Sequence, residues 1–272
     1  MKKVGEIETV KMKKNIDIYW FSGTGNTLLV AEKLAEVFRR NRRSVRFFPI
    51  EKSDPADIDT DHSLGLAFPV AAQSTYPLVW DFIEKLPPGE GTGVFMVDTL
   101  HSFSGGIVGP LRKLLAGKGY RPLGAREIPM PNNFLPGKIN PEKNRAKVES
   151  GLENAVLFAE ALLAGRARWG RVPLFSDLMN LLSRSRPVVN YLRRRGSKFK
   201  VEERSCTRCG TCVQLCPAAN IALEAEECPV FSDRCQQCMR CISFCPTGAI
   251  VVPGKKYKVY RAVTAAEILK HP

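Results

Sequence analysis

The sequence predicts an α/β fold, a doubly wound parallel sheet of five strands, followed by a small α+β domain organised around cysteines. From residue 16 to about residue 165, short apolar runs alternate with longer helical stretches, which is typical of stacked βα units. All nine cysteines lie between Cys206 and Cys245, in a stretch too short to bury much apolar core. With 272 residues, the chain is long enough for both domains.

Five apolar runs of strand length are expected to form the sheet. They are Ile16–Phe21, Val45–Ile50, Leu64–Pro69, Gly93–Thr99 and Arg121–Pro129. Four helices are expected between and after them, at Asn26–Arg39, Pro77–Leu86, Gly106–Leu115 and Glu142–Ala164. Pro77 suits a first helical turn and Gly165 suits a helix stop. Because a doubly wound sheet binds ligands at the carboxyl ends of its strands, binding motifs are expected directly after strands.

The boundaries follow from composition. A basic N-terminal tail covers residues 1–15, the α/β domain 16–165, a basic amphipathic connector 166–200, the cysteine-rich domain 201–253 and a C-terminal tail 254–272. The chain has 44% hydrophobic residues, no apolar run of membrane-helix length and no signal-peptide core, so a soluble cytoplasmic protein is expected.

The formal charge of +14 is concentrated in the connector, which holds ten Lys or Arg and one acid. Because its arginines are interrupted by apolar residues, no nucleic-acid partner is expected. One interpretation is that its apolar residues Leu174, Phe175, Leu178 and Leu182 dock on the α/β domain while Arg193, Arg194 and Arg195 stay solvated. The others are that the connector meets an acidic redox partner protein or an anionic membrane surface.

The cysteine-rich domain contains two copies of the pattern C-x₂-C-x₂-C-x₃-C-P. The first copy holds Cys206, Cys209, Cys212 and Cys216, and the second holds Cys235, Cys238, Cys241 and Cys245. In such runs three thiolates hold one 4Fe–4S cluster and the fourth reaches the other cluster. One predicted ligand set is therefore Cys206, Cys209, Cys212 and Cys245, and the other is Cys235, Cys238, Cys241 and Cys216.

Zinc is the alternative occupant, because C-x₂-C pairs also build zinc sites. A tetrahedral zinc ion has no use for a third cysteine at the same interval, which favours clusters. Cys228 falls outside both repeats and is expected to be a small buried apolar residue, with a ligand or redox role as the alternative.

A loop rich in glycine and hydroxyl groups follows the first expected strand and opens the first helix. Its residues are Ser22, Gly23, Thr24, Gly25, Asn26 and Thr27. Hydroxyls and the N–H groups of a helix N-terminus form a cradle for a terminal monophosphate. A Walker loop would need Gly-Lys-Ser/Thr, and the dinucleotide fingerprint would need a small residue where Leu28 stands.

These motifs carry a family resemblance. Residues 201–253 resemble a bacterial-type two-cluster ferredoxin, including Pro217 and Pro246 after the fourth cysteines, and the loop at 22–27 is similar to the FMN phosphate loop of flavodoxins. The whole chain resembles the flavodoxin/ferredoxin fusion family. The resemblance implies FMN and two 4Fe–4S clusters as cofactors.

In flavodoxins two further loops enclose the flavin ring, and the resemblance assigns them here to the loops after the third and fourth strands. The matching residues are Pro69, Val70, Ala71 and Tyr76 in one, and Thr99, Leu100, His101, Ser102, Phe103, Ser104 and Gly105 in the other. Phe103 is the first candidate for stacking on the ring and Tyr76 the second. His101 either donates to a flavin carbonyl or has no role. Residues 130–134 either lie near the flavin or close the sheet.

Together these features predict an electron-transfer protein that couples one-electron and two-electron donors and acceptors. A flavin exchanges one or two electrons, whereas a 4Fe–4S cluster exchanges one. No catalytic triad or paired-carboxylate motif is present, which favours a carrier over a dedicated enzyme. The alternative is a flavin-dependent reductase of a small molecule, fed by the ferredoxin domain.

Overall fold

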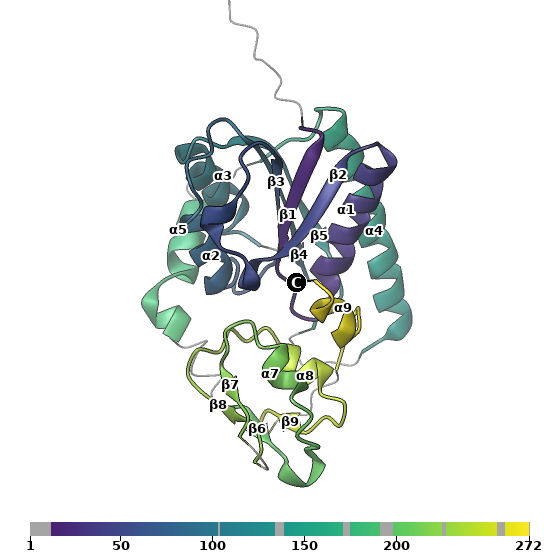
Figure 1. Cartoon of the computed structure of the whole chain (residues 1–272), viewed down its shortest axis with the longest axis vertical. Coiled ribbons are helices and arrows are strands. Elements are labelled where there is room, and N and C mark those ends of the chain that lie inside the picture. The colour runs from purple at the N-terminus through teal and green to yellow at the C-terminus, as the bar shows by residue number, and fades with distance from the viewer. Residues whose placement is uncertain are drawn as a thin grey trace, which may run out of the picture.

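A computed structural model of the chain describes residues 12–102, 104–133, 139–170, 175–190, 198–224, 227–254 and 259–271. Its main sheet has five parallel strands in the order β2-β1-β3-β4-β5 (Figure 1). The strands are β1 Asn15–Trp20, β2 Ser44–Pro49, β3 Ser63–Pro69, β4 Gly93–Leu100 and β5 Arg121–Pro129. This strand order is that of flavodoxin-like doubly wound folds, so the predicted fold class is confirmed.

Helices cover both faces of the sheet (Figure 1). They are α1 Asn26–Arg40 and α4 Pro141–Leu163 on one face, and α2 Pro77–Glu84 and α3 Val108–Gly117 on the other. The first pair packs through residues such as Leu34 and Phe158, and the second through Val79 and Leu111, all of them buried. Among the residues that the structure describes, no helix is both long and apolar enough to cross a bilayer.

The connector contributes a short helix, α5 Phe175–Ser183, beside α3. Its leucines do not dock as predicted, because Leu178 is 54% exposed and Leu182 is 53% exposed. The contacts come instead from its backbone at Asn180, which lies against Gly106, and from Arg184 over the ring of Trp80 at 4.3 Å. A backbone segment and an arginine thus make the contacts that the leucines were expected to make with the α/β domain. The side chains of Leu174, Phe175, Arg193, Arg194 and Arg195 lie outside the described residues.

The cysteine-rich domain is built from two small antiparallel pairs and two short helices, which confirms its α+β class. The pairs are β6 Lys200–Val201 with β9 Ile250–Val251, and β7 Ile221–Ala222 with β8 Val230–Phe231. The helices are α7 Thr211–Gln214 and α8 Arg240–Phe244. Its buried core is small, and it includes Phe199, Met239 and Ile242 next to the cysteines.

The C-terminal tail packs on the α/β domain. Its helix α9, Ala265–Leu269, begins with a capping box between Thr264 and Glu267, and Ile268 is buried in the same core as α1. His271 lies edge-on to Trp20 at 5.3 Å and stacks on Phe47 at 5.6 Å. The segment 259–271 is therefore part of the folded α/β domain.

Asp98 on β4 is fully buried, and no hydrogen-bond donor reaches either carboxylate oxygen within the described part of the chain. Burial, and then the nearby charge of Glu127, raise the pKa of Asp98 well above its usual value. Because the pKa is higher in the folded than in the unfolded state, the folded state keeps a proton over a pH range in which the unfolded state releases it. The stability of the fold must fall as pH rises above the unfolded pKa.

Asp98→Asn is expected to remove this dependence. Relative to the natural chain, the variant gains unfolding free energy as pH rises from about 5 to about 8, by at most about 1.4 kcal/mol per pH unit. Urea unfolding followed by circular dichroism measures the difference, with the exposed Asp61→Asn as control. A gain that is the same at both ends of the range contradicts the expectation.

Candidate functional site

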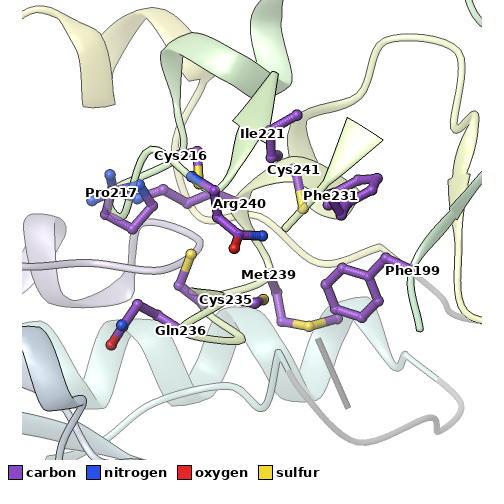
Figure 2. A pocket seen from close by; sticks show the side chains of 12 residues that line it. Phe199, Cys216, Pro217, Ile221, Phe231, Cys235, Gln236, Met239, Arg240 and Cys241 are labelled. Atoms are coloured by element: carbon purple, nitrogen blue, oxygen red, sulfur yellow. The ribbon is translucent and has the colours of Figure 1, made fainter. Parts of the chain in front are cut away.

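Two cavities lie in the cysteine-rich domain, and each gathers four cysteines. The inner cavity is lined by Cys235, Cys238 and Cys241 of the second repeat together with Cys216 of the first. Figure 2 shows Cys216, Cys235 and Cys241 around it. The outer cavity is lined by Cys206, Cys209 and Cys212 of the first repeat together with Cys245 of the second. Each encloses about 330 Å³, solvent at its mouth included. The structure thus brings together the same two sets that the spacing predicts.

The backbone explains how each repeat turns its thiols inward. Arg208 and Gly210 in the first repeat have left-handed backbones, with φ of 55° and 71°. Gln237 and Met239 occupy the equivalent positions in the second repeat, with φ of 55° and 66°. A left-handed residue other than glycine costs about 1 kcal/mol or more. The same costly turn at both places is what lets three closely spaced cysteines face one cavity.

The inner cavity has a mainly apolar lining, and none of its four cysteines is fully exposed. Burial raises the pKa of Cys238 to about 12 and raises those of Cys235 and Cys241 as well. The N–H of Asn220 donates to Sγ of Cys216 at 3.2 Å. Buried thiolates are costly unless cations compensate their charge, and the iron ions of a cluster would do so. These residues therefore fit a 4Fe–4S cluster.

The outer cavity has a more polar lining than the inner one. Cys209 is exposed, and a hydrogen bond with the Thr211 hydroxyl lowers its pKa. Burial alone would raise the pKa of Cys245, but hydrogen bonds from Thr247 and nearby N–H groups outweigh it and lower the pKa. Burial raises the pKa of Cys212 to about 11. The pKa is thus lowered at Cys209 and Cys245 in the outer cavity, whereas it is raised at Cys235, Cys238 and Cys241 in the inner one.

Cys228 lies beside the outer set. It is half-buried rather than fully buried as predicted. Burial, and then a hydrogen bond to the Cys206 thiol, raise its pKa. It does not line either cavity.

The loop at 22–27 joins β1 to α1 and has the donors that a phosphate needs. Ser22, Thr24 and Thr27 are each 1% exposed, so their hydroxyls are buried. Gly25 has φ +106° and starts α1 without a side-chain cap, which leaves the first N–H groups of the helix open to an anion. The Thr27 hydroxyl also lies 2.8 Å from that of Thr99 at the end of β4. This donor set fits a monophosphate.

The loops after β3 and β4 lie at the same edge of the sheet. The N–H of Val70, next to Pro69, donates to the Thr99 carbonyl at 2.8 Å. Val70 and Ala71 are half-buried, and His101 and Ser102 are exposed. The remaining predicted residues of the second loop are Leu100 and Ser104, which are buried, Gly105, which is half-buried, and Phe103, which lies outside the described residues.

His101 is in contact with Lys147 of α4. Nζ of Lys147 donates to the His101 carbonyl at 2.7 Å. Burial, and then the charge of Lys147, lower the pKa of His101, so its imidazole is neutral at neutral pH. A neutral ring in this loop retains one donor and one acceptor nitrogen.

Tyr76 does not lie among the exposed residues of these loops. It is 9% exposed and lies edge-on to Phe21 at 5.1 Å, in the same buried cluster as Cys238. Burial, and then the nearby Cys238, raise its pKa. The residue that precedes α2 therefore lies against the inner cavity.

The segment after β5 reaches the phosphate loop. The side-chain amide of Asn26 donates to the Pro131 carbonyl at 2.9 Å, and that of Asn133 donates to the Thr24 hydroxyl at 2.8 Å. Of the two predicted positions for residues 130–134, these contacts favour one beside the cofactor loop. Phe134 lies outside the described residues.

Arg240 joins the two domains, although no sequence motif singles it out. It is 3% exposed, between Cys238 and Cys241. Its Nε donates to the Ser22 carbonyl at 2.8 Å, its Nη1 pairs with Glu51, and its guanidinium lies 4.9 Å from the centre of the Phe21 ring. An arginine between two ligands in such a repeat is normally expected to be solvated.

Comparisons with known proteins agree with this two-part organisation. Residues 198–246 match the family model of the 4Fe-4S dicluster domain. No curated protein matches the chain. The strand order and this match together confirm the expected combination of a flavodoxin-like domain with a dicluster ferredoxin domain.

Among solved structures, the Megasphaera elsdenii flavodoxin in its two-electron reduced form is 19% identical, with 52% of this chain and 98% of that one covered and a TM-score of 0.39. A short-chain flavodoxin associated with a non-canonical PDU bacterial microcompartment is 14% identical, with 56% and 99% covered and a TM-score of 0.43. Rubredoxin oxygen:oxidoreductase from Desulfovibrio gigas is 20% identical, with 57% of this chain covered and a TM-score of 0.36. The chain spans only 38% of the length of that protein.

Proposed function

We propose that this chain is an electron-transfer protein that relays electrons between FMN and two 4Fe–4S clusters, coupling one-electron with two-electron donors and acceptors. The observation that carries the proposal is the direct contact between the inner cavity and the phosphate loop. A Cβ atom on Gly23 would lie only 2.6 Å from the carbonyl oxygen of Cys238. The backbone of Cys238, one of the four cysteines of that cavity, thus touches the loop.

The residues assign each cofactor a place. The loop at 22–27 would hold the FMN phosphate, with the loops after β3 and β4 at the flavin ring. Cys216, Cys235, Cys238 and Cys241 would hold the inner cluster, and Cys206, Cys209, Cys212 and Cys245 the outer one. When bound, FMN exchanges one or two electrons and each cluster exchanges one.

The two cavities differ in what they face. Tyr76, Gly23 and α2 lie against the inner set, and the side-chain oxygen of Gln236 accepts from the N–H of Leu78 at the start of α2. The outer set contains the exposed Cys209. The proposed order is therefore flavin, inner cluster, outer cluster and external partner.

Anaerobic purification followed by cofactor counting tests the proposal. About eight iron, about eight sulfide and one flavin per chain are expected. Dithionite titration should bleach flavin and cluster absorbance together, and paramagnetic resonance should detect the reduced clusters. Stoichiometric flavin without iron and sulfide, or clusters without flavin, would contradict the relay. Turnover of a small molecule by the reduced protein would favour a reductase instead.

The external partner is proposed to be an acidic redox protein that meets the basic connector. Arg193→Glu, Arg194→Glu and Arg195→Glu together are expected to slow reduction by an acidic ferredoxin about tenfold at low ionic strength, because opposite charges steer association. Stopped-flow absorbance measures the rate, and added salt should shrink the difference.

A charge-matched control tests whether the connector is the place of contact. Arg40, Arg42 and Arg121 lie at the amino edge of the sheet, away from the cysteines, and the same change there should leave the rate nearly unaltered. Equal slowing by both triple variants would point to net charge alone. No slowing by the connector variant would contradict the proposed partner.

A further inference from the structure

The C-terminal third of the chain holds the phosphate loop from outside. Backbone and side-chain groups of Cys238, Arg240, Tyr260, Ala262 and Val263, here called the C-terminal clamp, each contact a different residue between Ser22 and Asn26. Five successive loop residues are thus each in contact with the clamp.

Three of these contacts are hydrogen bonds. Nε of Arg240 donates to the Ser22 carbonyl at 2.8 Å. The N–H of Ala262 donates to the Thr24 carbonyl at 2.8 Å. The hydroxyl of Tyr260 donates to Oδ1 of Asn26 at 2.9 Å, which leaves the amide of Asn26 to donate to Pro131.

The two glycines make the other contacts. A Cβ on Gly25 would lie 2.5 Å from Cγ2 of Val263, and a Cβ on Gly23 would lie 2.6 Å from the Cys238 carbonyl oxygen. The clamp therefore packs on the loop with no room for a side chain at either position.

These contacts also set the polarity of the loop. A phosphate needs N–H and O–H donors, and a carbonyl oxygen turned toward it would repel it. The clamp engages the carbonyls of Ser22 and Thr24 from outside. The Ser22 hydroxyl accepts from the N–H of Gly25 and can still donate to an anion, as can the Thr27 hydroxyl when it accepts from Thr99. The first N–H groups of α1, which has no side-chain cap, complete the donor set.

We infer that the C-terminal clamp holds the phosphate loop in its anion-binding form, so that FMN binding and docking of the C-terminal third stabilise each other. The inference rests on the proposed FMN function of the loop. Coupling of this kind is reciprocal. FMN tightens the clamp by the same factor by which the clamp tightens FMN.

Tyr260→Phe in the full chain tests whether the clamp tightens FMN binding. It removes one hydroxyl that bonds to the loop, and FMN added to flavin-free protein is expected to bind about fivefold more weakly. Flavin fluorescence measures the dissociation constant. Tyr120→Phe is the matched control, because the Tyr120 hydroxyl is buried and has no hydrogen-bond partner among the residues that the structure describes. Iron and sulfide contents should stay equal in all three proteins.

Hydrogen exchange in the natural chain tests the reciprocal effect, that FMN tightens the docking of the clamp, and it needs no variant. Saturating FMN is expected to slow exchange of the amides between residues 259 and 271. Equal FMN affinity of Tyr260→Phe and the natural chain, or unchanged exchange in that segment, would overturn the coupling. Failure of the natural chain to bind FMN at all would instead overturn the proposed function, and the coupling with it.

Discussion

Replacing Arg240 with methionine is expected to weaken docking of the cysteine-rich domain on the phosphate loop by about 3 to 5 kcal/mol. The substitution leaves Glu51, whose side chain is 8% exposed, buried without its cation. It also leaves the Ser22 carbonyl without its donor. Electron exchange between flavin and clusters should slow markedly, because it depends on the docked arrangement. Flash photoreduction of the flavin, followed by cluster bleaching, measures that rate.

The pair with Glu51 supplies the controls for this result. Glu51→Gln keeps the contacts of Arg240 with Ser22 and Phe21 and should have a smaller effect. The double variant should recover part of the loss, because no buried carboxylate then lacks a partner. Arg240 is not a predicted ligand, so iron and sulfide contents should not change. An unaltered electron-transfer rate in Arg240→Met would contradict the proposed role of Arg240 in docking. So would a double variant whose loss of docking free energy equals the sum of the two single losses.

The fold was largely predictable because its signals are local. Buried parallel strands appear as short apolar runs, and all five strands begin and end within one residue of the prediction. The C-terminal tail was not predictable in this way. Its docking depends on isolated residues such as Val263, Ile268 and His271, which fit a surface formed by α1, β1 and β2. The local sequence pattern of the tail does not indicate which surface these residues contact.

The functional site, like the fold, was predictable where its signals are local and unpredictable where it depends on long-range contacts. The spacing of the cysteines and the run of hydroxyls and glycines encode local turns, so the two cavities and the loop lie where the sequence predicts. Arg240, Tyr260 and Ala262 act across more than two hundred residues of chain on the loop. The exposed leucines of α5 illustrate the converse, because helical spacing predicts a buried stripe but not whether a partner surface accepts it.

Cys216→Ala and Cys245→Ala are expected to remove different clusters, although each is the fourth cysteine of its own repeat. Crossed ligation assigns Cys216 to the inner cavity and Cys245 to the outer one. Each variant should keep about half of its iron and sulfide. The Cys216 variant should lose electron exchange between flavin and cluster. The Cys245 variant should keep that exchange and lose delivery to an external acceptor. Anaerobic metal analysis and flash photoreduction measure both properties.

The pair separates crossed from uncrossed ligation, because the two arrangements predict opposite outcomes. If each repeat held its own cluster, Cys216→Ala would remove the cluster far from the phosphate loop, and flavin-to-cluster exchange would survive. Cys238, whose carbonyl touches Gly23, belongs to the inner set in either arrangement. Whether flavin-to-cluster electron exchange survives in the Cys216 variant therefore distinguishes crossed from uncrossed ligation. Cys228→Ala is the matched control, since Cys228 lines neither cavity and its loss should leave both clusters in place.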